Sequence, residues 1–203
     1  MSYQRITIPY LDKDFIKHRA DFFREKYHGS SVPVDIEKII EIKLKIDIIP
    51  LPDARRSYSL EALITSNWKS IYVDKYAYDN QDNRLRFSLA HEIGHFLLHK
   101  KVYEDLKIKS VTDFYKAVEE IPIKQYGYLE AQANYFANFL LVPREELKLE
   151  REKLLKKIKN EEIIKKIDPK MINSYLAELL TRIFDVSAEV IEISLNNLNN
   201  NNL

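Results

Sequence analysis

The sequence predicts an α+β fold in which a small sheet and several helices share one hydrophobic core. Of the 203 residues, 45% are hydrophobic, which is enough for one domain with a sizeable core or for a core with a small appendage. Three strand-like runs lie close together, at Leu44–Pro50, Leu60–Thr65 and Lys69–Asp74. These runs predict a small antiparallel sheet. The segments before and after them have apolar residues at helical spacing.

Two helices are predicted before the strands. The first covers roughly Asp12 to His28 and stops at Gly29, because glycine is favoured directly after a helix. The residues of this helix that are expected to face the core are Phe15, Ile16, Ala20, Phe23 and Tyr27. The second helix is shorter, begins near Pro33 and carries Ile36, Ile39 and Ile40.

The run from His91 to His95, which reads His-Glu-Ile-Gly-His, is the most informative motif of the chain. Apolar and small residues recur around it at helical spacing, namely Phe87, Ala90, Ile93, Gly94 and Leu97. This pattern predicts a largely buried helix, with Asp82 or Asn83 available as its N-terminal cap.

Each polar residue of this motif suits a separate task in metal-assisted hydrolysis. On a helix, His91 and His95 lie about 40° apart around the axis and one turn apart along it, so both imidazoles can bind one metal ion. Glu92 projects beside that ion, where it can take a proton from the attacking water as a general base. Gly94 would cost roughly 1 kcal/mol relative to alanine inside a helix, which indicates that another backbone passes close to it.

A catalytic zinc ion has three protein ligands and one open position, so a third ligand is required. His99 continues the helical series, but eight residues of helix place it about 12 Å along the axis from His91. Only a sharp turn would bring it back to the metal. We therefore interpret His99 as a C-terminal helix residue that the helix dipole favours.

The better candidate is Glu130, in a second helix that starts near Tyr128 and that Pro143 ends or interrupts. One face of this helix is narrow and small, with Glu130, Ala133, Asn134, Ala137 and Leu141. The small residues match Gly94, so the two helices can approach closely and bring Glu130 to the metal. Asn134, one turn later, is placed to hold the free N–H of a ligand imidazole. The alternative is an ordinary core helix whose Glu130 points to solvent.

The segment between His99 and Glu130 is too long for a plain connection and is expected to carry a helix from Val111 to Glu119. Its position between the ligands makes it a candidate lip of the active-site cleft. Three tyrosines are candidates for stabilising an oxyanion, on proximity in sequence alone: Tyr72, Tyr126 and Tyr128. The run Ser70–Asp74 is a candidate for aligning an extended substrate, and equally an ordinary core strand.

After Pro143 the composition changes. Residues 144–170 combine ten Lys or Arg with seven Asp or Glu and predict an exposed helix or helix pair. Asp168-Pro169 is expected to cap a further helix that extends through Phe184.

Ser187 is expected to cap the last helix, which extends through about Leu195. This helix contains no Lys or Arg, so it is poorly suited to approach phosphates, and direct DNA binding is disfavoured. A helical cap that helps to hold a protein substrate is the better interpretation. The polar run Asn196–Asn202 predicts a disordered tail.

Composition excludes several other kinds of site. The chain has no cysteine, which leaves histidine and carboxylate as the metal ligands. A net charge of +1 gives no overall attraction to nucleic acid or to a membrane. No run approaches the ~20 apolar residues of a membrane span, and the first residues do not resemble a signal peptide. These features predict a cytoplasmic protein without a membrane partner.

At these motifs the chain resembles the ImmA/IrrE metallopeptidases, on the run Arg86–His99 and on Glu130, Ala133, Asn134, Phe136, Ala137, Leu140, Leu141 and Pro143. These are bacterial and phage proteins with a gluzincin-like zinc site that cleave helix-turn-helix transcriptional repressors. The resemblance implies that His91, His95 and Glu130 bind one zinc ion (Zn²⁺) per chain. It implies that Glu92 is the general base and that Asn134 lies just behind the ligands. Gln132 stands where many members carry a second acidic residue, which we expect to matter little.

The resulting hypothesis is a zincin-like metallopeptidase core at residues 1–143, a helical C-terminal extension at 144–195 and a polar tail at 196–203. The expected activity is zinc-dependent cleavage of a cytoplasmic regulatory protein, with a helix-turn-helix repressor as the substrate that the resemblance implies. The alternative is a non-catalytic zinc-containing module that binds a repressor or antitoxin. An intact Glu92 argues against that alternative, because a purely structural site needs no base.

Overall fold

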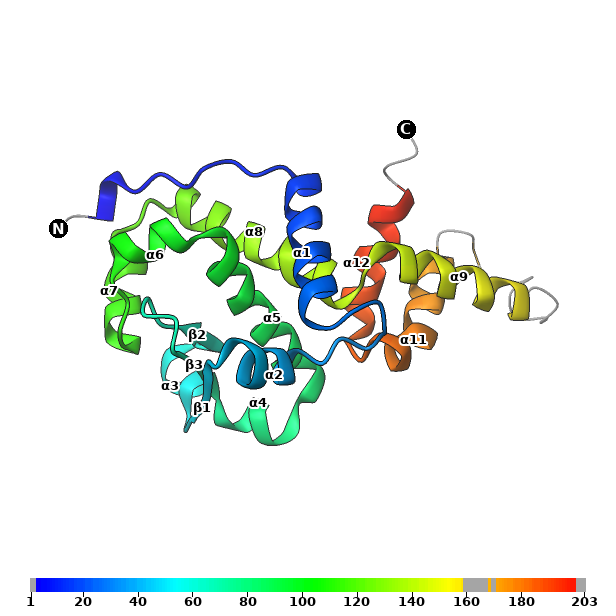
Figure 1. The fold of residues 1–203 in the computed structure, drawn as a ribbon, viewed down its shortest axis with the longest axis horizontal. Coiled ribbons are helices and arrows are strands. Elements are labelled where there is room, and N and C mark those ends of the chain that lie inside the picture. Colours follow the sequence, from blue (N-terminus) through cyan, green and yellow to red (C-terminus); the bar gives the residue numbers. More distant parts are fainter. Residues whose placement is uncertain (1–2, 159–167, 169–170, 200–203) are drawn as a thin grey trace.

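A computed structural model describes residues 3–158, 168 and 171–199. Within these residues, helices surround one small sheet, and the C-terminal helices lie together at one end of the molecule (Figure 1). This arrangement confirms the α+β fold with a helical C-terminal region. No helix in the described part of the chain combines the length and hydropathy needed to cross a membrane.

The N-terminal segment begins with a 3-10 turn, η1 (Tyr3–Arg5), and leads as an extended arm to α1 (Lys13–Tyr27). Asp12 caps α1 by accepting a hydrogen bond from the backbone N–H of Phe15 (2.7 Å), and Gly29 follows with a φ of +96°. The predicted helix and its stop are therefore confirmed. The prediction that Phe15 faces the core is wrong, because Phe15 is 46% exposed. Its position, one residue before Ile16, lies off the face that α1 packs against α8.

The second predicted helix is present as a short α2 (Ile36–Lys38) that continues as a π-helix, η2 (Ile39–Leu44). Three isoleucines of this segment are fully buried, as expected: Ile36, Ile39 and Ile40. The π-helix ends at Lys45, which adopts a left-handed conformation. This turn directs the chain into the first strand.

Among the described residues, β1 (Asp47–Leu51), β2 (Ala62–Ile64) and β3 (Ser70–Asp74) form one sheet, in the order β1-β3-β2. β2 pairs antiparallel with β3, whereas β1 pairs parallel with β3. The prediction of a purely antiparallel sheet is therefore wrong. The crossover through α3 (Ala54–Tyr58) carries the chain past one strand position, so β3 lies between the other two.

The sheet leads through α4 (Lys75–Asn80) into the motif helix α5 (Asp82–Leu98). Gln81 alone separates these two helices, and no side chain caps α5. The prediction that Asp82 or Asn83 caps this helix is wrong, because Asp82 already lies in its first turn. Its carboxylate therefore acts on the helix dipole and not as a cap.

Three helices follow α5: α6 (Lys100–Leu106), α7 (Val111–Glu120) and α8 (Ile123–Leu141). The helix predicted from Val111 is confirmed. α5 and α8 pack closely along their length. A Cβ atom added to Gly94 would lie 3.0 Å from Ala133 Cα and 3.1 Å from its carbonyl oxygen, so a backbone passes close to this glycine, as predicted.

In the C-terminal region, the structure describes α9 (Arg144–Ile158), α11 (Ile172–Phe184) and α12 (Ala188–Asn199). Ser187 accepts a weak hydrogen bond from the N–H of Val190 (3.4 Å), as expected of the cap of α12. Of the predicted Asp168-Pro169 cap, Pro169 lies outside the described residues. Asp168 is not the N-cap of α11, which begins at Ile172 after Met171.

The prediction of a disordered tail from Asn196 is wrong for the residues that the structure describes. α12 continues through Asn199, and Asn196 accepts a hydrogen bond from the side-chain amide of Asn173 (2.8 Å). This contact from α11 lengthens the last helix beyond Leu195. Residues 200–203 and 159–167 lie outside the described part of the chain.

The C-terminal helices contact the preceding core. Asn138 of α8 donates to the carbonyl of Val190 (3.2 Å) and accepts from the hydroxyl of Ser194 (2.9 Å). Arg24 of α1 forms an ion pair with Glu146 of α9 (2.9 Å). These contacts cross the predicted boundary at residue 143, and the division into a core, a helical extension and a polar tail stays a prediction.

Candidate metal centre

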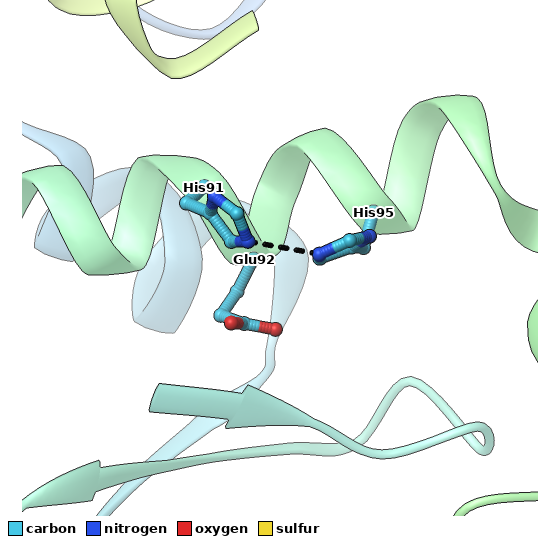
Figure 2. Close-up of side chains that lie close together, drawn as sticks. All are labelled: His91, Glu92 and His95. Atoms are coloured by element: carbon cyan, nitrogen blue, oxygen red, sulfur yellow. Dashed lines mark hydrogen bonds between the residues drawn. The ribbon is translucent and has the colours of Figure 1, made fainter. Parts of the chain in front are cut away.

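Three polar side chains of α5 meet on one side of this helix. The Nε2 atoms of His91 and His95 are 2.9 Å apart, and Glu92 extends from α5 toward the strands (Figure 2). The potential ligand atoms of these three residues lie within 4.8 Å of one another. The two histidines are one helical turn apart, which is why both rings reach the same point. This group can hold a metal ion.

Glu130 joins this group from α8. Its carboxylate oxygens lie 3.3 Å from Nε2 of His91 and 3.6 Å from Nε2 of His95. The close contact between Gly94 and Ala133 brings α8 near enough for this approach. Two imidazole nitrogens and one carboxylate therefore converge, as the sequence predicted.

Both imidazoles are held from behind. Nδ1 of His91 lies 2.9 Å from Oδ1 of Asn134, which the sequence had placed one turn after Glu130. Nδ1 of His95 lies 3.0 Å from Nδ1 of His99. With the outer nitrogens so occupied, the Nε2 atoms face the carboxylate of Glu130 and, when deprotonated, can offer their lone pairs to a metal ion. Such a set of electron-pair donors favours a cation at its centre.

The titration of the two histidines reflects the same convergence. Burial lowers the pKa of His91, but its hydrogen bond to Glu130 and the charges of Glu92 and Glu130 outweigh this effect and raise the pKa to about 9. Burial and the charge of His91 hold the pKa of His95 well below its usual value. In the absence of a metal, His91 is therefore protonated near neutral pH, and this proton supplies a positive charge between the carboxylates.

Glu92 is buried between α5 and the sheet. Its Oε2 accepts a hydrogen bond from the backbone N–H of Ile64 in β2 (2.8 Å). Burial raises the pKa of this carboxyl to about 7, against the charge of His91 and the Ile64 hydrogen bond, which lower it. A carboxyl group with a pKa near neutrality can both take up and release a proton.

His99 does not have the role that its position suggested. His99 lies at the C-terminal cap of α5, as predicted. The part of the prediction in which the helix dipole favours it is wrong, because His99 is 1% exposed and its Nε2 lies 2.9 Å from Oε1 of Gln132. Burial lowers the pKa of His99 to about 4, so the ring is neutral. α5 ends at Leu98, and the contact that encloses His99 comes from a residue 33 positions later. No local pattern in the sequence announces such a contact.

The family model for the IrrE N-terminal-like domain, a peptidase family, matches residues 44–196. This chain belongs to the IrrE N-terminal-like family. The resemblance to ImmA/IrrE proteins on the two motifs is thereby confirmed. Membership fits a metallopeptidase or a regulator-related role, and it fits the metal-binding group on α5.

Among solved structures, a Mycobacterium tuberculosis transcriptional regulator is similar in fold, with a TM-score of 0.54 and 14% sequence identity. The match covers 87% of this chain and 44% of that chain, so this chain spans less than half of the regulator's length. Among curated proteins, none matches this sequence.

In this member of the IrrE-like family, the candidate metal centre opens into a cavity of about 300 Å³. Its walls come from α5, α7, α8 and the segment Ser59–Leu63. Of the three tyrosines that the sequence offered, Tyr126 lines this cavity, whereas Tyr72 and Tyr128 are not among its lining residues. Phe114 of α7 lines it too, which supports the predicted lip.

Tyr103 of α6 also lines this cavity, although sequence analysis did not single it out. It is buried, and its ring centroid lies 5.3 Å from that of His95. Burial, together with the charges of Glu92 and Glu130, raises the pKa of Tyr103 well above its usual value. The spacing of four residues between His99 and Tyr103 was the one available signal, because it extends the motif by another turn.

A second and larger cavity, of about 1050 Å³, continues from the first. The two share four lining residues: Glu61, Phe87, Ser88 and Asn134. The larger cavity runs along the N-terminal half of α5 toward α12. The IrrE-like centre therefore lies at the end of a long cleft between the core and the C-terminal helices.

Proposed function

We propose that this protein is a zinc-dependent endopeptidase that cleaves a cytoplasmic regulatory protein, with a helix-turn-helix transcriptional repressor as its substrate. One observation carries the proposal: Nε2 of His91, Nε2 of His95 and the carboxylate of Glu130 converge, and the outer nitrogen of each imidazole is already engaged. Such a set offers three ligands with a fourth position open, as in catalytic zinc sites.

Glu130 is a better third ligand than Glu92. Its two oxygens lie 3.3 and 3.6 Å from the two histidine nitrogens, whereas Glu92 is tied by Oε2 to the N–H of Ile64. Two imidazoles and one carboxylate suit zinc, with one ion per chain. When bound, zinc polarises the scissile carbonyl and makes water a stronger nucleophile.

Glu92 is the proposed general base. The N–H of Ile64 occupies Oε2 and fixes the carboxylate, so Oε1 is the oxygen that takes the proton from the attacking water. The position of Glu92 beside His91 and His95 suits proton uptake from water followed by release of that proton to the leaving amine. Asn134 holds the ring of His91 during this transfer.

The edge of β2 is the proposed support for an extended substrate. Hydrogen bonds from Asp74 N–H to the Glu61 carbonyl and from Thr65 N–H to the Ser70 carbonyl join β2 to the central strand. The backbone N–H and C=O groups of successive residues point to alternate edges of such a strand. Those of Ala62 therefore point to the same edge as the N–H of Ile64, and Ala62 lines the cavity. Its free peptide groups can pair with a substrate backbone. β3, the sequence-based candidate, is the central strand and pairs on both edges.

Tyr126 is the proposed donor to the oxyanion. Its side chain lines the small cavity with the metal-binding residues. Burial and the charge of Glu130 raise the pKa of Tyr126 above its usual value, so the hydroxyl keeps its proton and can donate it in a hydrogen bond. A donor fixed beside the reacting carbonyl stabilises the charge that develops there.

The long cleft supports a polypeptide substrate. It offers about 1050 Å³ beyond the cavity at the metal centre, which is more than a single amino-acid side chain needs. The C-terminal helix α12 forms one wall of it, in keeping with the expected helical cap. The fold-level likeness to a transcriptional regulator supports a regulatory context for the substrate.

The test uses purified, zinc-loaded protein and helix-turn-helix repressors encoded beside its gene. We expect a repressor to be cut at a defined bond, and a chelator to stop cleavage. Glu92→Gln should retain zinc and fold, because the side chain is nearly isosteric, and cleavage should fall by at least ~10²-fold while repressor binding persists. Equal cleavage by Glu92→Gln would contradict the mechanism. Tight binding by the parent without cleavage would favour the non-catalytic interaction module.

A further inference from the structure

A chain of buried polar groups connects the metal centre to the N-terminal arm. It runs from His95 through His99 and the side chain of Gln132 to the carbonyl of Pro9. The three side chains are 2%, 1% and 5% exposed, so water does not replace these partners. Each group in the chain has its donor or acceptor role fixed by the next one.

The carbonyl of Pro9 determines which group donates and which accepts in each of these hydrogen bonds. A carbonyl only accepts, so the group of Gln132 that faces it at 2.9 Å is the NH₂. The carbonyl oxygen of that same amide therefore faces His99, at 2.9 Å from Nε2. An oxygen acceptor there requires a proton on Nε2 of His99. The ring is buried and its hydrogen-bond partners are a neutral amide and another imidazole, so it carries this one proton and is neutral.

The tautomer of His99 determines that of His95 at the candidate metal centre. Because His99 carries its proton on Nε2, its Nδ1 is an acceptor, and Nδ1 of His95 at 3.0 Å must donate. A neutral His95 with its proton on Nδ1 has its lone pair on Nε2. That atom lies beside His91 and Glu130.

We propose that Gln132 and His99 are positioning residues that hold His95 in the tautomer protonated at Nδ1. The N-terminal arm takes part, because Pro9 fixes the orientation of the Gln132 amide. Beside Pro9, the N–H of Ile8 donates to Oε1 of Gln125 (2.6 Å), which anchors the arm to α8. Gln132 therefore has a defined role, whereas its sequence position had suggested none.

This inference rests on the proposed role of His95 as a ligand, and the ring tautomers test it without any metal. In metal-free parent protein, long-range ¹H–¹⁵N correlations should show His95 protonated at Nδ1 and His99 at Nε2. In Gln132→Leu the acceptor for His99 is lost, so both rings should become mixtures of tautomers. Zinc affinity, measured by chelator competition, should fall by about 10–100-fold, as for other partners that orient ligand imidazoles.

Asn138→Leu is the matched control. It removes a buried amide from the same helix and breaks hydrogen bonds to Val190 and Ser194, so it tests general destabilisation of α8. The ring tautomers and the zinc affinity should match those of the parent. If Gln132→Leu fails to fold, Gln132→Asn gives the same readouts, because its amide is one methylene too short to span Pro9 and His99.

Unchanged tautomers in the folded Gln132 variant would overturn the inference, as would altered tautomers with unchanged zinc affinity. A parent that binds no zinc would contradict the proposed function. In that case the tautomers of the metal-free parent and of Gln132→Leu would still show whether the network orients His95.

Discussion

The helix pair α5–α8 and the C-terminal helices α9, α11 and α12 are built on different principles. The pair is joined by small residues at Gly94 and Ala133 and by polar side chains that converge between the helices. The C-terminal helices bury apolar residues such as Leu180 and Leu195 and carry their charges on exposed faces. Tolerance to substitution should therefore differ sharply between the two regions.

The largest expected effect tests the ligands. The double variant His91→Ala, His95→Ala should lose tight zinc binding, because one carboxylate remains of the three proposed ligands. Glu130→Ala should weaken binding more than His99→Ala, which removes only a positioning ring. Metal content and chelator competition measure both. If Glu130→Ala were silent while His99→Ala lost the metal, the choice of third ligand would be wrong.

A smaller effect is expected from Tyr126→Phe. Removal of one oxyanion donor should lower kcat by about 10²–10³-fold, while zinc affinity and KM change little because the ring still lines the cavity. Steady-state kinetics on a cleaved repressor peptide measures this split. Tyr128→Phe, an exposed neighbour on the same helix, is the control. A parallel loss in both variants would argue against Tyr126 as the donor.

The helix contact can be broken with a single methyl group. In Gly94→Ala, overpacking against the Ala133 backbone typically costs about 1–3 kcal/mol, which opposes a gain of about 1 kcal/mol in helix propensity. We expect a net loss of stability and weaker zinc binding, as Glu130 moves away. Gly127→Ala is the control, because nothing lies within 4 Å of a Cβ added there, and it should stabilise α8. Denaturant unfolding separates the two outcomes.

The smallest effect on the metal centre is expected from Ser194→Ala in α12. This change leaves Oδ1 of Asn138 without its donor and should cost about 1–3 kcal/mol of unfolding free energy. Zinc affinity should equal that of the parent, because in the described part of the chain Ser194 makes no hydrogen bond to a proposed ligand and its partner Asn138 lies about two turns from Glu130 on α8. A marked loss of zinc affinity would show that the two regions are coupled.

The helix pair was also the part most accessible to sequence analysis. Spacing on a helix fixes which side chains share a face, so His91, His95, Glu130 and Asn134 lie together as predicted. The small residues on one face of α8, together with Gly94, likewise predicted that the two helices lie in close contact. These are local rules that act within one or two helical turns.

Other features depended on contacts that no local pattern specifies. The parallel pairing of β1 follows from the order of the strands in the sheet. The alternation of apolar and polar residues along a strand does not reveal this order. His99 is held by Gln132, 33 positions away, and the amide of Gln132 is in turn held by the carbonyl of Pro9 in the N-terminal arm. The continuation of α12 through Asn196 depends on Asn173. In each of these cases the prediction failed because a tertiary contact outweighed a local preference.

The position of Asn134 one turn after Glu130 has a thermodynamic consequence. One face of α8 supplies the third ligand and also the partner of His91, so a rotation of α8 by one residue would remove both at once. Metal binding and docking of this helix are therefore linked equilibria. A ligand at 100 times its dissociation constant stabilises the native state by about 2.7 kcal/mol. The ion would then stabilise the packing of α8 on the core. Metal depletion would weaken this packing as well as abolish catalysis.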